Sequence, residues 1–140
     1  MSAQTLQFSS EYENVGPICA QVIEVISTSL DAEKLIELQI ALSEALNNVI
    51  EHSYSEQGGL PVIVQFSVCT EKVSISIKDQ GRGMPAGWVT PETRFEEVSI
   101  DNLENLAEGG MGMQLIDGCV DELNYEKTDT HNVLTFKKFK

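Results

Sequence analysis

A carboxylate and two consecutive asparagines stand close together in the stretch 40–54, IALSEALNNVIEHSY. Glu44 and Asn48 are four residues apart, so on a helix their side chains lie one turn above the other and can converge on one ligand. Asparagine costs a helix interior roughly a few tenths of a kcal/mol relative to Ala, so Asn47 and Asn48 point to a purpose other than helix stability. A solvated helix face is the alternative interpretation. His52, one turn further on, is as consistent with packing as with a role in a site.

Two glycine-containing stretches could hold a ligand through their backbone. The first, DQGRG at 79–83, follows a predicted strand, and the second, GGMG at 109–112, precedes a predicted helix. Pro85 leaves no long helix after the first stretch, which excludes a dinucleotide-binding fingerprint, and no P-loop sequence occurs in the chain. Each glycine pair alone is also what a tight turn needs. Their joint occurrence favours a ligand site.

The spacing of apolar residues predicts the elements that must position these groups. Asn14 is expected to cap a first helix that ends near Ser29, and Asp31 is expected to cap the helix that carries Glu44 and Asn48. The remaining predictions are a weak strand at 5–9, a hairpin of strands 62–69 and 73–78, a helix from 110–112 to 120, and a second hairpin of strands near 122–125 and 133–139.

This order of elements predicts an α/β (α+β) two-layer sandwich, in which a mostly antiparallel mixed sheet carries helices on one face. A length of 140 residues suits a single domain spanning 1–140. The acidic segment 86–108 has no strand signal and exceeds a normal connection in length, so it is expected to be a lid or a disordered segment.

Composition limits the classes of partner. The chain holds 22 acidic residues against 9 Lys and Arg, a net charge of −13, which disfavours nucleic acid and anionic membranes and favours a basic protein. The three cysteines are far apart and only two histidines occur, so neither a disulfide framework nor a zinc site is indicated. Neither a leader nor an apolar segment of membrane-spanning length is found, and a cytoplasmic location is expected.

Three motifs carry a resemblance to a known family. Glu44 and Asn48 in LSEALNNVIEH, DQGRGMP at 79–85 and GGMGM at 109–113 resemble, in order and spacing, the nucleotide-binding boxes of the GHKL, or histidine-kinase-like, ATPase superfamily. The pattern SEAL-N-x-x-x-H followed by a hairpin is similar to the anti-sigma-factor serine kinases of bacterial partner-switching systems. The resemblance covers nearly the whole chain and implies a Bergerat-type ATP-binding fold.

The resemblance implies ATP and Mg²⁺ as cofactors and gives three side chains a role. Asn48 is the expected Mg²⁺ ligand, since this ion prefers oxygen donors. Glu44 is the expected catalytic base, one turn away from the metal ligand. Asp79 is expected to accept a hydrogen bond from the adenine amino group.

The glycines have backbone roles in the same scheme. Gly81 and Gly83 would let the chain bend around the nucleotide. Gly110, Met111 and Gly112 would present backbone N–H groups to phosphate at a helix N-terminus, where the helix dipole favours an anion. The segment 86–108 becomes the lid.

The implied function is a protein serine/threonine kinase that sequesters a sigma factor or similar regulator and phosphorylates a small antagonist protein, with a homodimer as the family's assembly. Two positions depart from the family pattern. Glu108 stands where relatives have a basic residue that reaches the γ-phosphate, and Cys19 stands at about the position where relatives often carry a first-helix arginine for partner contact. Two alternatives therefore stay open: a nucleotide-gated binding module without kinase activity, and a stand-alone ATPase.

Overall fold

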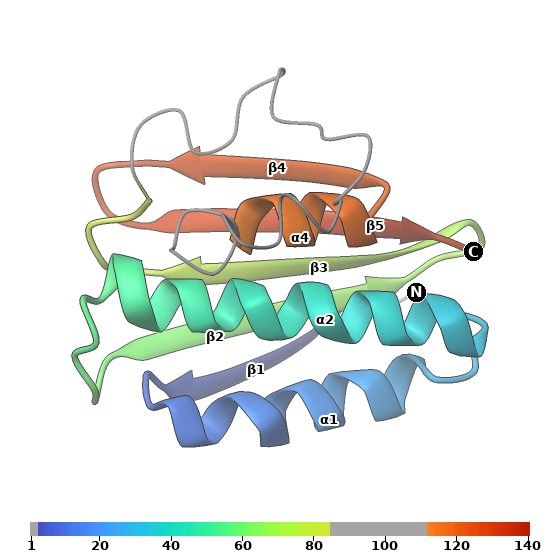
Figure 1. The fold of residues 1–140 in the computed structure, drawn as a ribbon, viewed down its shortest axis with the longest axis horizontal. Helices are drawn as coiled ribbons and strands as arrows, with labels where there is room; N and C mark the ends of the chain where they lie inside the picture. The colour runs from blue at the N-terminus through green and yellow to red at the C-terminus, as the bar shows by residue number, and fades with distance from the viewer. Residues whose placement is uncertain (1–2, 85–111) are drawn as a thin grey trace, which may run out of the picture.

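The computed structural model describes residues 3–84 and 112–140, and it has two layers (Figure 1). One layer is a sheet, and the helices α1, α2 and α4 lie together over one of its faces. The elements in chain order are β1 (Gln4–Ser9), the 3-10 turn Tyr12–Asn14, α1 (Val15–Ile26), α2 (Ala32–Asn48), the π turn Val49–Ser53, β2 (Pro61–Val68), β3 (Lys72–Asp79), α4 (Gly112–Cys119), β4 (Glu122–Lys127) and β5 (Asn132–Phe139).

The described strands form one sheet in the order β1-β2-β3-β5-β4, with every neighbouring pair antiparallel. Val64, Ile77 and Leu134 stand opposite one another on adjacent strands, and all three are buried beneath the helices. The alternate residues face the other way and are mostly polar. On that face Gln65 bonds Thr5 at 3.3 Å, which is the alternation expected of a sheet with one covered face.

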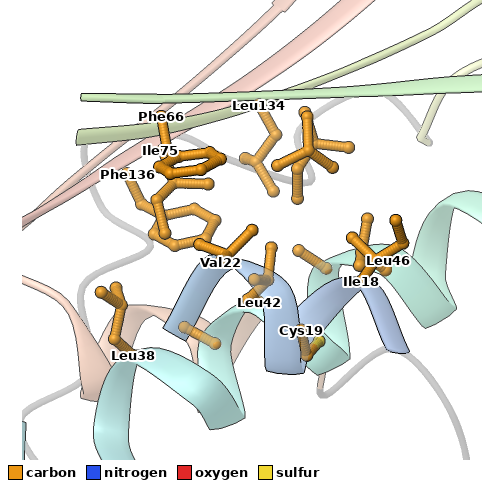
Figure 2. Packing of buried hydrophobic residues seen from close by; sticks show 14 of the residues in the cluster. Ile18, Cys19, Val22, Leu38, Leu42, Leu46, Phe66, Ile75, Leu134 and Phe136 are labelled. Atoms are coloured by element: carbon orange, nitrogen blue, oxygen red, sulfur yellow. The ribbon is translucent and has the colours of Figure 1, made fainter. Parts of the chain in front are cut away.

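The core lies between the sheet and the apolar sides of α1 and α2 (Figure 2). Leu38, Leu42 and Leu46 of α2 repeat every four residues and are fully buried, as the sequence spacing predicts. Each such side chain contributes about 1.5–3 kcal/mol by leaving water. The residues of α1 and of the sheet that meet them in Figure 2 are Ile18, Cys19, Val22, Phe66, Ile75, Leu134 and Phe136.

The predicted fold class is confirmed, and so are both hairpins and the strand at the sheet edge. The first helix begins directly after Asn14, as predicted, but its cap and its end differ from the prediction. Asn14 closes a 3-10 turn, and its side chain donates to the Ser9 carbonyl at 2.8 Å instead of capping α1. The helix ends at Ile26, three residues before Ser29, because a turn follows. The expected lid at 86–108 lies outside the described residues.

The second helix is capped as predicted, with the Asp31 carboxylate accepting from the Lys34 backbone N–H at 2.8 Å. Its far end is not a regular α-helix. The α-helical pattern stops at Asn48, and the chain widens into the π turn Val49–Ser53. Such turns are rare and often occur at functional sites. Here the turn carries Ser53 to the end of β3.

The opposite end of the molecule is tied by a buried lysine. The Lys138 ammonium on β5 donates to the Cys119 carbonyl at 2.8 Å and lies 3.2 Å from the Glu37 carboxylate. One side chain thus joins β5, the C-terminus of α4 and α2. Within the residues that the structure describes, no helix is long and apolar enough to cross a membrane.

Candidate functional site

Asp79 is the last residue of β3, and its buried side chain is held by three donors. All three bonds end on Oδ1: from the Ser53 hydroxyl at 2.5 Å, from the Gly81 backbone N–H at 2.9 Å and from the Asn132 amide at 2.9 Å. Oδ2 receives no hydrogen bond from any described residue. One oxygen therefore fixes the carboxylate, and the other is left to accept a bond from a ligand.

The loop that follows Asp79 requires its glycines. A Cβ on Gly81 would meet the Ser53 carbonyl and hydroxyl, so this loop touches the π turn directly. Gly83 has a φ of +79°, which L side chains rarely adopt, and a Cβ there would lie 2.8 Å from the Asn132 amide oxygen. The Gly83 N–H donates to the Ser53 hydroxyl at 3.0 Å. The glycines thus let the loop close around the same network that fixes Asp79.

Ser53, Asn132 and two tyrosines were missed by reasoning from the sequence. The Tyr125 hydroxyl accepts from the Met84 N–H, and the Tyr54 hydroxyl accepts from the Gln80 N–H, both at 2.8 Å. Asn132 stands directly opposite Asp79 in the β3–β5 ladder, although 53 residues separate them. A register between strands so distant cannot be read from one sequence. The only available signal was polar side chains at the ends of apolar strands.

Asn48 is buried at the last α-helical position of α2, with 7% of its surface exposed. Its Nδ2 is buried and has no acceptor among the described residues. Leaving such a donor unpaired costs about 1–3 kcal/mol, so an orphaned amide in a native fold calls for an explanation. The alternative interpretation of a solvated helix face was therefore wrong for this residue. The amide instead fits a ligand contact, with Oδ1 as the oxygen donor that Mg²⁺ prefers.

Glu44 lies half-buried one turn before Asn48 and has no hydrogen bond or ion pair with any described residue. Burial raises the pKa of Glu44 above its ordinary value, and the nearby Glu51 carboxylate raises it further. A carboxylate shifted in this direction holds a proton more readily, which suits a general base. The described residues contain no cluster of three metal-ligating side chains. A metal near Asn48 would therefore take its other ligands from water and phosphate.

Residues 8–138 match the family model described as the histidine kinase-like ATPase domain. The chain belongs to this family. It is also similar to the serine-protein kinase RsbW of Staphylococcus aureus, in the strains bovine RF122 / ET3-1 and MRSA252. In each case the two sequences are 27% identical over 122 residues, covering 79% of this chain and 76% of the relative. The expected resemblance is thereby confirmed.

A structural comparison agrees on the fold. The chain is similar to the crystal structure of the RsbU and RsbW domains of Rv1364c from Mycobacterium tuberculosis, with a TM-score of 0.67 and 15% identity. The similarity covers 99% of this chain and spans a third of that longer one. At this identity it concerns the fold alone, which is the histidine kinase-like ATPase fold.

Membership of an ATPase family implies that the chain binds ATP, and the expected residues are grouped accordingly. Asp79, Gly81 and Gly83 are joined through Ser53, which follows Asn48 by one π turn. The last helix begins at Gly112 as predicted and packs on α2. The roles expected for Gly110 and Met111 lie outside the described residues. These residues therefore bring together, at one end of α2, a fixed carboxylate and two polar groups that have no partner among the described residues.

Proposed function

We propose that this chain is an ATP- and Mg²⁺-dependent protein serine/threonine kinase of the anti-sigma-factor type. It would sequester a sigma factor or a comparable regulator and phosphorylate a small antagonist protein. The observation that carries the proposal is the pairing of Glu44, which has a raised pKa and no partner among the described residues, with the orphaned amide of Asn48 one turn away. The similarity to RsbW, itself named a serine-protein kinase, supports the choice of reaction.

Each residue has a defined task in this reaction. Asp79 accepts the adenine amino group on Oδ2, because Oδ1 is occupied by its three donors. Asn48 offers its amide oxygen to Mg²⁺, which neutralises phosphate charge. Glu44 accepts the proton of the attacking serine hydroxyl. The serine oxygen bonds to the γ-phosphorus, the bond to the β–γ bridging oxygen breaks, and ADP leaves with that electron pair.

The test is transfer of labelled phosphate. The purified chain, [γ-³²P]ATP and Mg²⁺ are incubated with a lysate of its own cell, and the expected result is one small labelled protein. Matched reactions use Glu44→Ala, or EDTA in place of Mg²⁺, and should lack that band. Labelling that persists with Glu44→Ala would mean that another kinase in the lysate is responsible or that Glu44 is not the base.

A nucleotide-gated binding module is the second candidate, and Glu108 favours it. An anion in place of the family's basic residue opposes the charge neutralisation that phosphoryl transfer needs. In this case the chain captures its regulator only with ATP present and transfers no phosphate. A stand-alone ATPase would hydrolyse ATP without a protein substrate. The proposed function also places the chain in the cytoplasm, as a homodimer, with its regulator and antagonist.

A further inference from the structure

Two isoleucines of α2 are exposed to solvent. Ile36 is 59% exposed and Ile40 is 38% exposed, and they are four residues apart, so their side chains stack one turn above the other. They lie on the side of the helix turned away from the buried Leu38 and Leu42. Among the described helices, α2 lies between α1 and α4 (Figure 1). Ile36 and Ile40 therefore form an apolar ridge at the outer middle of the helix layer.

Helix propensity does not account for the apolar ridge. Isoleucine is β-branched and is a poorer helix former than Ala, Leu, Lys or Glu. A large aliphatic side chain also loses free energy by staying in water. Single exposed apolar residues are ordinary on a protein surface, but two that stack on one helix face form a continuous apolar strip. Such a strip favours a surface that a partner covers.

The acidic charge of the described chain is concentrated on the side of the apolar ridge. Residues 1–60, which form β1, α1 and α2, hold nine acidic residues and one basic residue, Lys34. The segments 61–84 and 120–140, which form the other four described strands, hold six acidic and seven basic residues. The sheet is thus nearly neutral and the helix layer strongly negative. A partner for this side of the molecule is therefore expected to be basic.

Two carboxylates stand beside the apolar ridge itself. Glu33 precedes Ile36 by three residues and Glu37 precedes Ile40 by three residues, so both lie along the same side of α2. Glu37 is already paired with Lys138 at 3.2 Å. Glu33 is exposed. The surface thus combines an apolar strip with a carboxylate that a partner can reach.

These features select one occupant. A second copy of the chain would set this acidic layer against itself, because a two-fold interface brings the same surface of both subunits together. Nucleic acid and anionic membranes are repelled for the same reason. A basic helix is attracted, and side chains four residues apart form the kind of ridge against which a second helix packs. We propose that the apolar ridge docks a basic amphipathic helix of a partner protein.

The docked helix has a defined chemistry. Leu or Ile at a spacing of three and four residues would contact Ile36 and Ile40, and Lys or Arg beside them would contact Glu33. The regulator or antagonist of the proposed function would supply this helix, so in that respect the inference rests on that function. The apolar ridge has no part in the nucleotide contacts proposed for Asn48 and Asp79. Altering it should therefore leave ATP affinity unchanged.

The experiment titrates the full chain with a fluorescent peptide of about 18 residues, built from Leu, Ala and Lys with leucine on one helical face. Anisotropy gives the affinity, and NMR of the isoleucine methyl groups locates the contact. Saturable binding with shifts at Ile36 and Ile40 is expected. The double variant Ile36→Ala, Ile40→Ala should bind about tenfold more weakly or worse, because the apolar contact is lost. Ala favours the helix, so folding should survive, and circular dichroism checks this.

Val25→Ala is the matched control for the apolar ridge. Val25 is also β-branched and is 47% exposed, but it belongs to α1. Its replacement should leave the peptide affinity unchanged. An equal loss in this variant and in the double variant would mean that the peptide binds exposed apolar groups without preference, and would overturn the proposal.

Glu33→Gln tests the charge. It should weaken binding by about two- to fivefold and lower its salt dependence, as the loss of an exposed charge pair does. Glu126→Gln, an exposed position on β4, is its control and should leave the affinity in place. Equal losses in these two variants would mean that only the net charge attracts the peptide, which contradicts docking on the apolar ridge.

Other results would also overturn the proposal. They are equal affinity of the double variant and the unmutated chain, equal binding of a scrambled peptide of the same composition, and isoleucine methyl shifts that depend on protein concentration without peptide. The last result would assign the apolar ridge to a second copy of the chain. The titrations contain no ATP, so their failure would leave the proposed phosphate transfer standing, and a failure of transfer would leave the docking result standing.

Discussion

The two ends of the candidate site are built in opposite ways. At the end of β3, three donors converge on one oxygen of Asp79, so the carboxylate is fixed before any ligand arrives. At the end of α2, Asn48 keeps an orphaned amide and Glu44 has no partner among the described residues. The group proposed to contact adenine has three hydrogen bonds before any ligand binds. The groups proposed to contact the metal and to accept the proton keep polar atoms without a partner among the described residues.

This availability lowers stability at the α2 end. The orphaned Asn48 donor costs about 1–3 kcal/mol. The raised pKa of Glu44 means that the folded state binds this proton more tightly than the unfolded chain does. Its contribution to stability is therefore complete below the ordinary glutamate pKa and is lost as the pH rises through the raised value. Above that raised pKa the fold carries an ionised carboxylate in a place that disfavours it.

The largest effect is expected for Glu44→Ala. A base acts chiefly in the transition state, so phosphate transfer should fall by about 10² or more while ATP–Mg²⁺ affinity is kept. Asn48→Ala should lower both, since a metal contact already operates in the bound ground state. Single-turnover transfer and calorimetry measure the two quantities.

Asn47→Ala is the matched control on the same turn and should leave transfer and affinity unchanged. Circular dichroism checks the helix, which Ala favours. An unaltered transfer rate in Glu44→Ala would show that this carboxylate is a surface group.

Asp79→Asn tests the other end of the site. The amide is a weaker acceptor than a carboxylate, both for its three donors and for an adenine amino group. ATP affinity should fall by roughly 5- to 150-fold, equivalent to about 1–3 kcal/mol. Calorimetry with ATP and GTP gives the value. Equal affinity for ATP in the variant would remove Asp79 from the adenine contact.

A pair of glycine substitutions tests whether the loop after Asp79 rests on the π turn. Gly81→Ala places a methyl against the Ser53 backbone, which cannot rotate away, and should cost about 1–3 kcal/mol of stability. Gly16→Ala is the control, because a Cβ there meets nothing and α1 should gain about 0.4–1 kcal/mol. Denaturant unfolding measures both. Similar stabilities for the two variants would mean that the loop does not rest on the π turn.

The smallest effect concerns pH. Transfer needs ionised Glu44, so its rate should rise with pH through the raised pKa of that carboxyl group. Glu51→Gln removes the second cause of the shift and should move the acid limb to lower pH. Glu24→Gln, exposed on α1, should leave the profile in place. A profile that does not move would rule out coupling between Glu44 and Glu51.

Periodicity predicted the parts of the fold that depend on neighbours in sequence. The Leu38, Leu42 and Leu46 stripe and both hairpins follow from local spacing. Asn14 was predicted as a helix cap because its type favours that position, but a local 3-10 turn took its side chain to Ser9. The partners of Asp79 could not be predicted, since Asn132 depends on strand register.

The candidate site, like the fold, could be predicted only in part from the sequence. Glu44, Asn48, Asp79, Gly81 and Gly83 were predicted from their motifs and from the family resemblance, and their roles stay predictions. Their burial, and which of them lack partners, depend on how α2 ends. The π turn is the decisive detail, and no residue in VIEHS marks it in advance.

Because of that turn, the number of residues between Asn48 and Ser53 should be more strictly constrained than the types of those residues. The wide turn closes with bonds from the Tyr54 N–H to Val49 and from the Glu56 N–H to Ile50. Deleting one residue would let an ordinary α-helix form, and the helix rotation would carry the Ser53 hydroxyl off the carboxylate. Substitutions at the exposed Glu51 leave this geometry intact. The exposed position Glu51 should therefore accept exchanges of side chain, whereas the segment should accept neither an insertion nor a deletion.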